Sequence, residues 1–293
     1  TDFFEAALAN GINAFDTARV YMEAEHSFGN WLEKSGRREE VVILSKCGHP
    51  DAMWNKRVNE KEMRKDLKKS LEELKTDYID IYMLHRDDPD TDVAVAVETF
   101  NAMHEEGNIG AFGASNWTHT RIEEANEYAY KHNLIPFSVS SPNFCLARQI
   151  EDPWGGGCVN ISGPENQEAR AWYEKNQMPV IAYASLGRGF FSGRMKSEYA
   201  DHASDYLDSF AMTGYACSDN FERLRRCEII AERHGVTVAQ IAMNWIFSHP
   251  LNIFAIASMS KADRMKANRE ALLLQLSDEE IAYLDLETPE FCG

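Results

Sequence analysis

Several residues that could perform acid–base chemistry stand at the ends of short apolar runs. Asp16, Lys46 and His85 each close such a run, and Tyr21 follows Asp16 by five residues. A tyrosine hydroxyl has a reference pKa of about 10, which is too high for an efficient acid near neutrality. The ammonium of Lys46 could stabilise the phenolate and lower this pKa, and Asp16 could hold the lysine charged and in place. His85 offers a second donor that could orient a carbonyl oxygen.

This set of side chains predicts a reaction in which a carbonyl group is polarised and then protonated. The sequence contains nothing that resembles an activated serine or cysteine nucleophile. An external hydride donor would therefore complete the chemistry, with Tyr21 as the acid.

The elements that carry these residues alternate regularly between strand and helix. At residues 60–75, Met63, Leu67, Leu71 and Leu74 fall on one face of a predicted helix. Strands that alternate with such helices predict βα units and a parallel sheet. The predicted strands are residues 13–16, 41–46, 78–84, 109–114, 136–140, 180–184 and 253–257.

The alternation continues without a change of composition, which predicts one domain over residues 1–293 with the α/β fold of a (β/α)8 TIM barrel. Seven strands stand against eight strand-following helices, of which the first covers residues 3–10. We therefore expect that the first strand precedes Thr1 and is missing from this sequence. Three long loops, at residues 47–59, 145–165 and 185–219, follow the carboxyl ends of strands, where such barrels carry their function.

Composition excludes several classes of partner. The net charge of −17 argues against nucleic acid or an anionic membrane as a partner, and no apolar run reaches the roughly 20 residues that span a bilayer. The six cysteines form no CxxC pair, so neither a zinc site nor any other metal site is expected. This cysteine usage fits a reducing compartment, and we expect a cytoplasmic protein.

The segments that contain these residues resemble the aldo-keto reductase family. The similarity includes residues 13–21, 43–46, 80–85 and 113–116, and it continues through residues 182–189 and 258–268. It covers nearly the whole chain in the right order. The resemblance implies a barrel fold and a catalytic tetrad of Asp16, Tyr21, Lys46 and His85.

The resemblance also implies a site for a nicotinamide cofactor. Ser115 and Asn116 would bind the carboxamide, while Tyr183 would stack on the ring. The family commonly has glutamine where Ser140 stands, so a contact from Ser140 to the carboxamide would be shorter or lost. The other implied contacts are Ser185, Leu186, Gly187, Arg188 and Gly193 along the pyrophosphate, and Ser258, Ser260, Arg264 and Asn268 at the adenosine end.

The preferred cofactor is expected to be NADPH rather than NADH. Arg264, flanked by Lys261 and Lys266, offers a planar cation for a 2′-phosphate, which an acidic protein needs locally. Ala267 stands where the family often has glutamate or glutamine, which weakens one adenine contact. A solvated basic helix face is the competing interpretation of Arg264 and Lys266.

These observations predict the NADPH-dependent reduction of an aldehyde or ketone, with sugars and quinone-like compounds among the substrate classes. A regulatory subunit that binds the cofactor without catalysis is the alternative, and a lyase that uses Lys46 as a Schiff base would leave Asp16 and Tyr21 unexplained. The physiological substrate and the oligomeric state are not readable from the sequence. His49 and four loop aromatic residues could form a substrate wall or simply pack in the interior. The four aromatic residues are Trp54, Trp117, Phe144 and Trp154.

Overall fold

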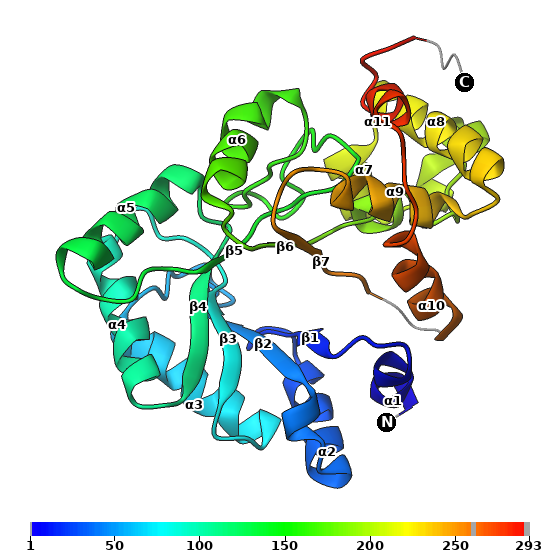
Figure 1. Cartoon of the computed structure of the whole chain (residues 1–293). Helices are drawn as coiled ribbons and strands as arrows, with labels where there is room; N and C mark the ends of the chain where they lie inside the picture. Colours follow the sequence, from blue (N-terminus) through cyan, green and yellow to red (C-terminus); the bar gives the residue numbers. More distant parts are fainter. Residues whose placement is uncertain (1, 259–261, 290–293) are drawn as a thin grey trace. The chain divides into compact units, whose positions relative to one another are not determined.

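A computed structural model describes residues 2–258 and 262–289 (Figure 1). The chain divides into two compact units, Thr1–Ser141 and Pro142–Gly293. Each unit combines parallel strands with helices. The expectation of one domain over residues 1–293 stays a prediction.

The first unit contains five strands that pair in chain order, each parallel to the next. Parallel neighbours need a crossover connection, which the intervening helices supply. Figure 1 shows α3, α4 and α5 along one face of these strands. The elements are α1 (Asp2–Ala9), β1 (Ala14–Asp16), α2 (Ala24–Ser35), β2 (Val42–Cys47), α3 (Glu60–Leu74), β3 (Ile79–Leu84), α4 (Val93–Glu105), β4 (Ile109–Ser115), α5 (His119–Lys131) and β5 (Val139–Ser141).

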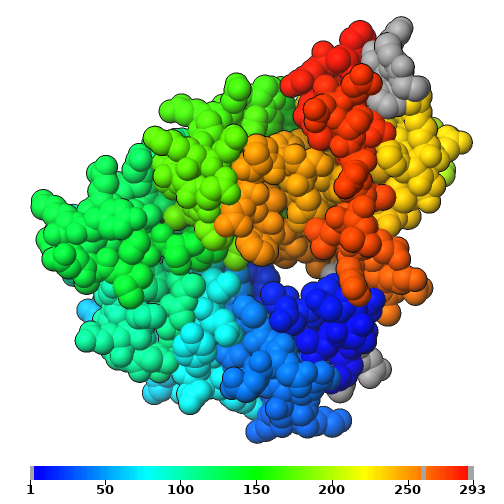
Figure 2. All heavy atoms as spheres, viewed as in Figure 1, coloured from blue at the N-terminus to red at the C-terminus, as the bar shows by residue number. Residues whose placement is uncertain are grey.

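The second unit is richer in helix and contains a parallel pair of strands. In the space-filling view the atoms of this unit run from green to red along the sequence (Figure 2). The elements are α6 (Gln167–Asn176), β6 (Val180–Ala182), α7 (Ser209–Tyr215), α8 (Ser218–His234), α9 (Val238–Phe247), β7 (Ile253–Ala255), α10 (Ala262–Ala271) and α11 (Asp278–Leu284).

The predicted fold class is confirmed. All strand pairs within the two units are parallel. The described part of the chain contains seven strands that alternate with helices, which corresponds to a (β/α)8 barrel with one of its eight strands missing. The strand predicted at residues 136–140 begins only at Val139, since Pro136 has no N–H for a strand ladder. The third long loop, at residues 185–219, contains helix α7, which the sequence prediction missed. Asp208 caps this helix by accepting a hydrogen bond from the N–H of Ala211 at 2.7 Å.

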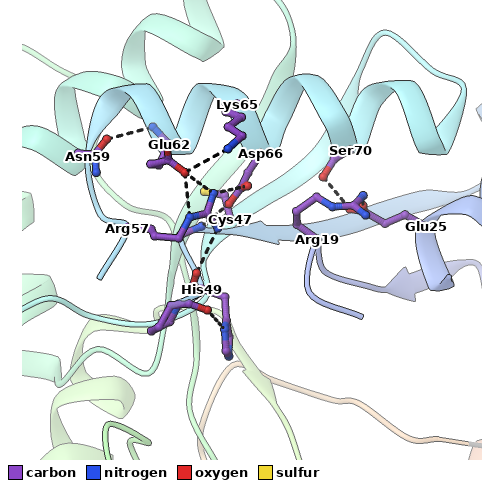
Figure 3. Close-up of polar contacts among 12 residues, drawn as sticks. Arg19, Glu25, Cys47, His49, Arg57, Asn59, Glu62, Lys65, Asp66 and Ser70 are labelled. Atoms are coloured by element: carbon purple, nitrogen blue, oxygen red, sulfur yellow. Dashed lines mark hydrogen bonds and ion pairs between the residues drawn. The ribbon is translucent and has the colours of Figure 1, made fainter. Parts of the chain in front are cut away.

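One buried carboxylate joins three elements of the first unit. Glu25, near the start of α2, is only 1% exposed and accepts hydrogen bonds from Ser45 Oγ on β2 (2.6 Å) and Ser70 Oγ on α3 (2.7 Å). Its second oxygen pairs with the guanidinium of Arg19 from the β1–α2 loop (Figure 3). A buried charge is costly unless it is paired and hydrogen-bonded. The four groups therefore fix the loop against β2, beside Lys46.

Replacing Glu25 by alanine should lower the free energy of unfolding by about 3 kcal/mol, because it leaves a partly buried guanidinium and two buried hydroxyl groups without their acceptor. Urea unfolding followed by circular dichroism measures this loss. Glu33→Ala is the matched control, since Glu33 pairs with Lys75 at the surface with 65% of its side chain exposed. The control should change stability by less than about 0.5 kcal/mol. Equal stability of the two variants would show that the buried carboxylate has no such role.

Candidate active site

A buried ion pair lies where β1 and β2 end. Strand β1 ends at Asp16, and its neighbour β2 places Lys46 beside it. Lys46 Nζ donates to Asp16 Oδ1 and to the carbonyl oxygen of Thr17 at 3.0 Å. The lysine side chain is only 3% exposed. Its ammonium is therefore fixed in position by two acceptors.

Tyr21 lies in the turn between β1 and α2, with its ring beside this ammonium. The ring centre is 5.3 Å from Lys46 Nζ and 5.5 Å from the ring centre of His85, which it meets at 85°. Desolvation raises the pKa of Tyr21 above its usual value of 10.0, while the charge of Lys46 opposes that rise. The sequence predicted a lowered pKa. Lys46 does act in that direction, but desolvation outweighs the ammonium, so the net prediction was wrong. Tyr21 therefore keeps its proton at neutral pH.

His85 follows β3 and is 9% exposed. The backbone N–H of His85 donates to the carbonyl oxygen of Cys47 at 2.8 Å, which fixes this residue beside the end of β2. Nδ1 of its ring is buried without a hydrogen-bond partner in the part of the chain that the structure describes. Burial, with the charge of Lys46, holds the pKa of His85 well below the usual 6.5. The ring is therefore neutral and carries one N–H to donate.

Arg86 lies beside the proposed acid–base residues and was not among the residues that the sequence predicted. It follows His85 directly and is 9% exposed. Its charge acts to lower the pKa of both Tyr21 and His85. Its position right after a strand-ending histidine was the available signal, although an arginine there is equally typical of a polar strand end.

Ser115, Asn116 and Ser140 lie at the ends of β4 and β5. Ser115 Oγ donates to the carbonyl oxygen of Ser141 at 2.8 Å, and Asn116 Nδ2 donates to the carbonyl oxygen of His85 at 3.1 Å. Ser140 is fully buried within β5. The side chain of Asn116 thus supports the backbone of His85, a contact that the sequence did not predict. Binding of the carboxamide by these residues stays a prediction.

In the second unit, the residues expected near the nicotinamide and pyrophosphate follow β6. Ser185 Oγ donates to the carbonyl oxygen of Ile256 at 2.8 Å, which joins this segment to the end of β7. The guanidinium of Arg188 donates to Asp208 at 2.8 Å and stacks between Trp154 (5.3 Å) and Phe210 (5.0 Å). Its charge is thus already paired within the protein, and its contact with a pyrophosphate stays a prediction. Also in this segment are Tyr183, Leu186, Gly187 and Gly193.

The residues expected at the adenosine end lie around α10. Arg264 and Asn268 are on this helix, and Ser258 is exposed before it. Arg264 is exposed and forms no ion pair within residues 2–258 and 262–289, whereas Lys266 pairs with Glu270 at 3.7 Å. Ser260 and Lys261 lie outside the described residues.

Two of the four aromatic residues proposed as a substrate wall are packed in the interior instead. Trp117 is 1% exposed and packs on Phe137 at 5.5 Å, and Phe144 is completely buried against Trp245 at 5.2 Å. The packing alternative therefore holds for both, because neither ring reaches the surface. Trp54 remains 61% exposed. Trp154 is half-buried and lies against Tyr183 at 6.0 Å.

Within the described residues, no group of three His, Cys, Asp or Glu side chains is placed to hold a metal ion. No described helix is both long and apolar enough to cross a membrane. The described cysteines are Cys47, Cys145, Cys158, Cys217 and Cys227, all with free thiols.

Comparison with known proteins identifies the family of this chain. A model of the Aldo/keto reductase family matches residues 1–286. "Aldo-keto reductase str7" of Strobilurus tenacellus is 25% identical, over 95% of this chain and 77% of its own length. "Protein tas" of Escherichia coli (strain K12) is 28% identical, over 95% of this chain and 86% of its own. The crystal structure of a thermostable aldo-keto reductase, Tm1743, in complex with the inhibitor epalrestat is similar with a TM-score of 0.71 at 24% identity, over 97% of this chain and 85% of that one. This chain therefore belongs to the aldo/keto reductase family.

Proposed function

We propose that this chain reduces an aldehyde or ketone to an alcohol, with NADPH as the reductant and Tyr21 as the proton donor. The observation that supports this most is the ammonium of Lys46, which lies 5.3 Å from the Tyr21 ring and is paired with Asp16. A cation in that position stabilises the phenolate that forms when Tyr21 gives up its proton.

Each residue of the group has a separate role in this scheme. The substrate oxygen accepts hydrogen bonds from Tyr21 and from the neutral ring of His85, which together polarise the carbonyl. The hydride for the carbonyl carbon would come from bound NADPH, the reductant of the reaction. The Tyr21 proton moves to the carbonyl oxygen, and the tyrosine regains a proton from water. Asp16 keeps Lys46 charged and in position throughout.

The substrate is an aldehyde or ketone, with sugars and quinone-like compounds among the candidates. Trp54 lies on the loop that follows β2, and its ring centre is 6.5 Å from that of His49, which in turn contacts His85. An exposed indole at this distance supports an aromatic wall on one side of the carbonyl.

The residues near α10 fit NADPH. Arg264 presents an exposed guanidinium that no described carboxylate neutralises. A planar guanidinium binds phosphate in a bidentate manner. Arg264 would hold the 2′-phosphate, and Ser258 and Asn268 would bind the adenosine next to it.

Replacing Tyr21 by phenylalanine should lower kcat by at least two orders of magnitude, because only the phenol proton is removed. Cofactor binding should stay nearly unchanged. Steady-state assays with a simple aldehyde and fluorescence titration of NADPH measure the two effects. Tyr130→Phe is the control, since Tyr130 lies on α5 with 66% exposure and should behave as wild type. If the Tyr21 variant keeps more than a few per cent of the wild-type rate, another group is the acid.

Replacing Lys46 by methionine should lower the rate by orders of magnitude and shift its pH dependence. Tyr21 works as an acid, so kcat/KM falls at alkaline pH as its hydroxyl loses the proton. The charge of Lys46 lowers the pKa of Tyr21. Without it that pKa rises, and the alkaline fall in kcat/KM moves to higher pH. Lys46→Arg, which keeps the charge, should shift the profile less. A profile unchanged in the methionine variant would show that the ammonium does not tune the acid.

We expect NADPH to bind at least tenfold more tightly than NADH, and Arg264→Ala to remove most of that difference. The protein has a net charge of −17, but physiological salt screens charges that lie more than about 8 Å from the extra phosphate. The cation nearest to that phosphate therefore determines the preference for NADPH. A charge-assisted contact of about 1.5–3 kcal/mol exceeds the 1.4 kcal/mol that corresponds to tenfold. Fluorescence titration of both cofactors at fixed salt measures the ratio. Lys266→Ala is the matched control, because Lys266 is already paired with Glu270. Equal affinities in the wild type would overturn the NADPH assignment.

A further inference from the structure

A second histidine lies against His85. His49 follows the end of β2, and its ring centre is 4.9 Å from that of His85, with the two ring planes at 72°. The His49 ring is half-buried, and its Nδ1 lies 2.8 Å from the carbonyl oxygen of Pro50. None of the proposed catalytic steps uses this ring.

The backbone on both sides of this ring is fixed by helix α3. The N–H of Gly48 donates to Asp66 Oδ2 at 3.0 Å, and the carbonyl oxygen of His49 accepts from Arg57 Nη1 at 3.2 Å. Arg57 in turn pairs with Asp66 at 2.7 Å and with Glu62 at 2.8 Å. Figure 3 shows Arg57 between His49 and this helix. Because two ion pairs hold the arginine, His49 is presented in one position rather than on a loosely held loop.

The protonation state of the ring decides which nitrogen can bind a ligand. A carbonyl oxygen only accepts hydrogen bonds, so Nδ1 must carry the hydrogen in the contact with Pro50. Partial burial lowers the pKa of His49, and the charges of Arg86 and Arg57 add to this effect. The ring is therefore neutral at pH 7, and its Nε2 carries a lone pair. Within the described residues Nε2 has no hydrogen-bond partner.

We propose that His49 is a specificity-determining residue whose Nε2 accepts a hydrogen bond from a hydroxyl group on the carbon next to the reacting carbonyl. The inference rests on the proposed function, in which His85 binds the carbonyl oxygen. A hydroxyl on the neighbouring carbon is separated from that oxygen by only two carbon atoms, and the His49 ring lies directly against that of His85. The preferred substrates are then 2-hydroxy aldehydes and ketones rather than their deoxy analogues.

A matched pair of substrates tests this assignment. We expect wild-type kcat/KM for 2-hydroxypropanal to exceed that for propanal about five- to tenfold, which lies within the range of one net hydrogen bond. His49→Phe should bring this ratio to about one by lowering kcat/KM for 2-hydroxypropanal, while kcat/KM for propanal stays within about twofold of wild type. His49→Gln, whose amide oxygen can accept a hydrogen bond, should restore part of the preference. His132→Phe, on an exposed histidine after α5, should leave the ratio unchanged.

A binding measurement separates this inference from the proposed function. The dissociation constants of the two alcohol products, 1,2-propanediol and 1-propanol, measured by NMR titration with the oxidised cofactor present, should differ in the wild type and converge in His49→Phe. If the chain reduces neither aldehyde, the proposed function fails. The ratio of these two dissociation constants still tests whether His49 binds the hydroxyl group. A ratio that is the same in wild type and His49→Phe, in rates or in binding, overturns the assignment.

Discussion

The arrangement of the first unit depends on the carboxylate of Glu25, which is shielded from water and shared by three elements. Its partners are a serine on β2, a serine on α3 and an arginine in the loop that contains Tyr21. Ser45 directly precedes Lys46, so the same strand presents one side chain to the carboxylate and the next to Asp16. A buried charge that is satisfied this completely resists displacement, since any movement of a partner exposes an unmet hydrogen bond. The proposed acid and its cation are therefore held at a fixed separation by a group that takes no part in the chemistry.

Asp66, one turn of α3 before Ser70, is a second buried carboxylate of this kind. It is 5% exposed, and it accepts from the N–H of Gly48 while pairing with Arg57. In both places a buried acidic residue on a helix fixes a loop that follows a strand. The loops that contain Tyr21 and His49 are thus rigid for the same physical reason, which suits a site that must hold its donors in place before a substrate arrives.

The sequence was informative where a residue's role follows from its place along the chain. Strand-ending polar residues such as Asp16, Lys46 and His85 could be predicted, because an apolar run with a polar terminus has a local signature. Glu25 could not be, since an acidic residue in the first turn of a helix is usually exposed, and its burial depends on serines from two distant segments. Trp117 likewise follows a strand end, and its ring is covered by Phe137 and by the guanidinium of Arg121, contacts that its position in the sequence does not reveal. The pKa of Tyr21 was predicted in the wrong direction, because the degree of desolvation is a property of the packed structure.

The proposed acid–base residues all lie between Asp16 and His85, whereas the guanidinium expected at the cofactor's phosphate is on the exposed face of α10. Surface side chains with few contacts can be exchanged at little cost to folding, while members of a buried hydrogen-bonded group cannot. Substitutions are therefore tolerated more often on the exposed face of α10 than among the buried residues around Lys46. Across descendants of this chain, the preference between two reduced nicotinamide cofactors can drift, while the proton donor and its supporting residues are inherited together.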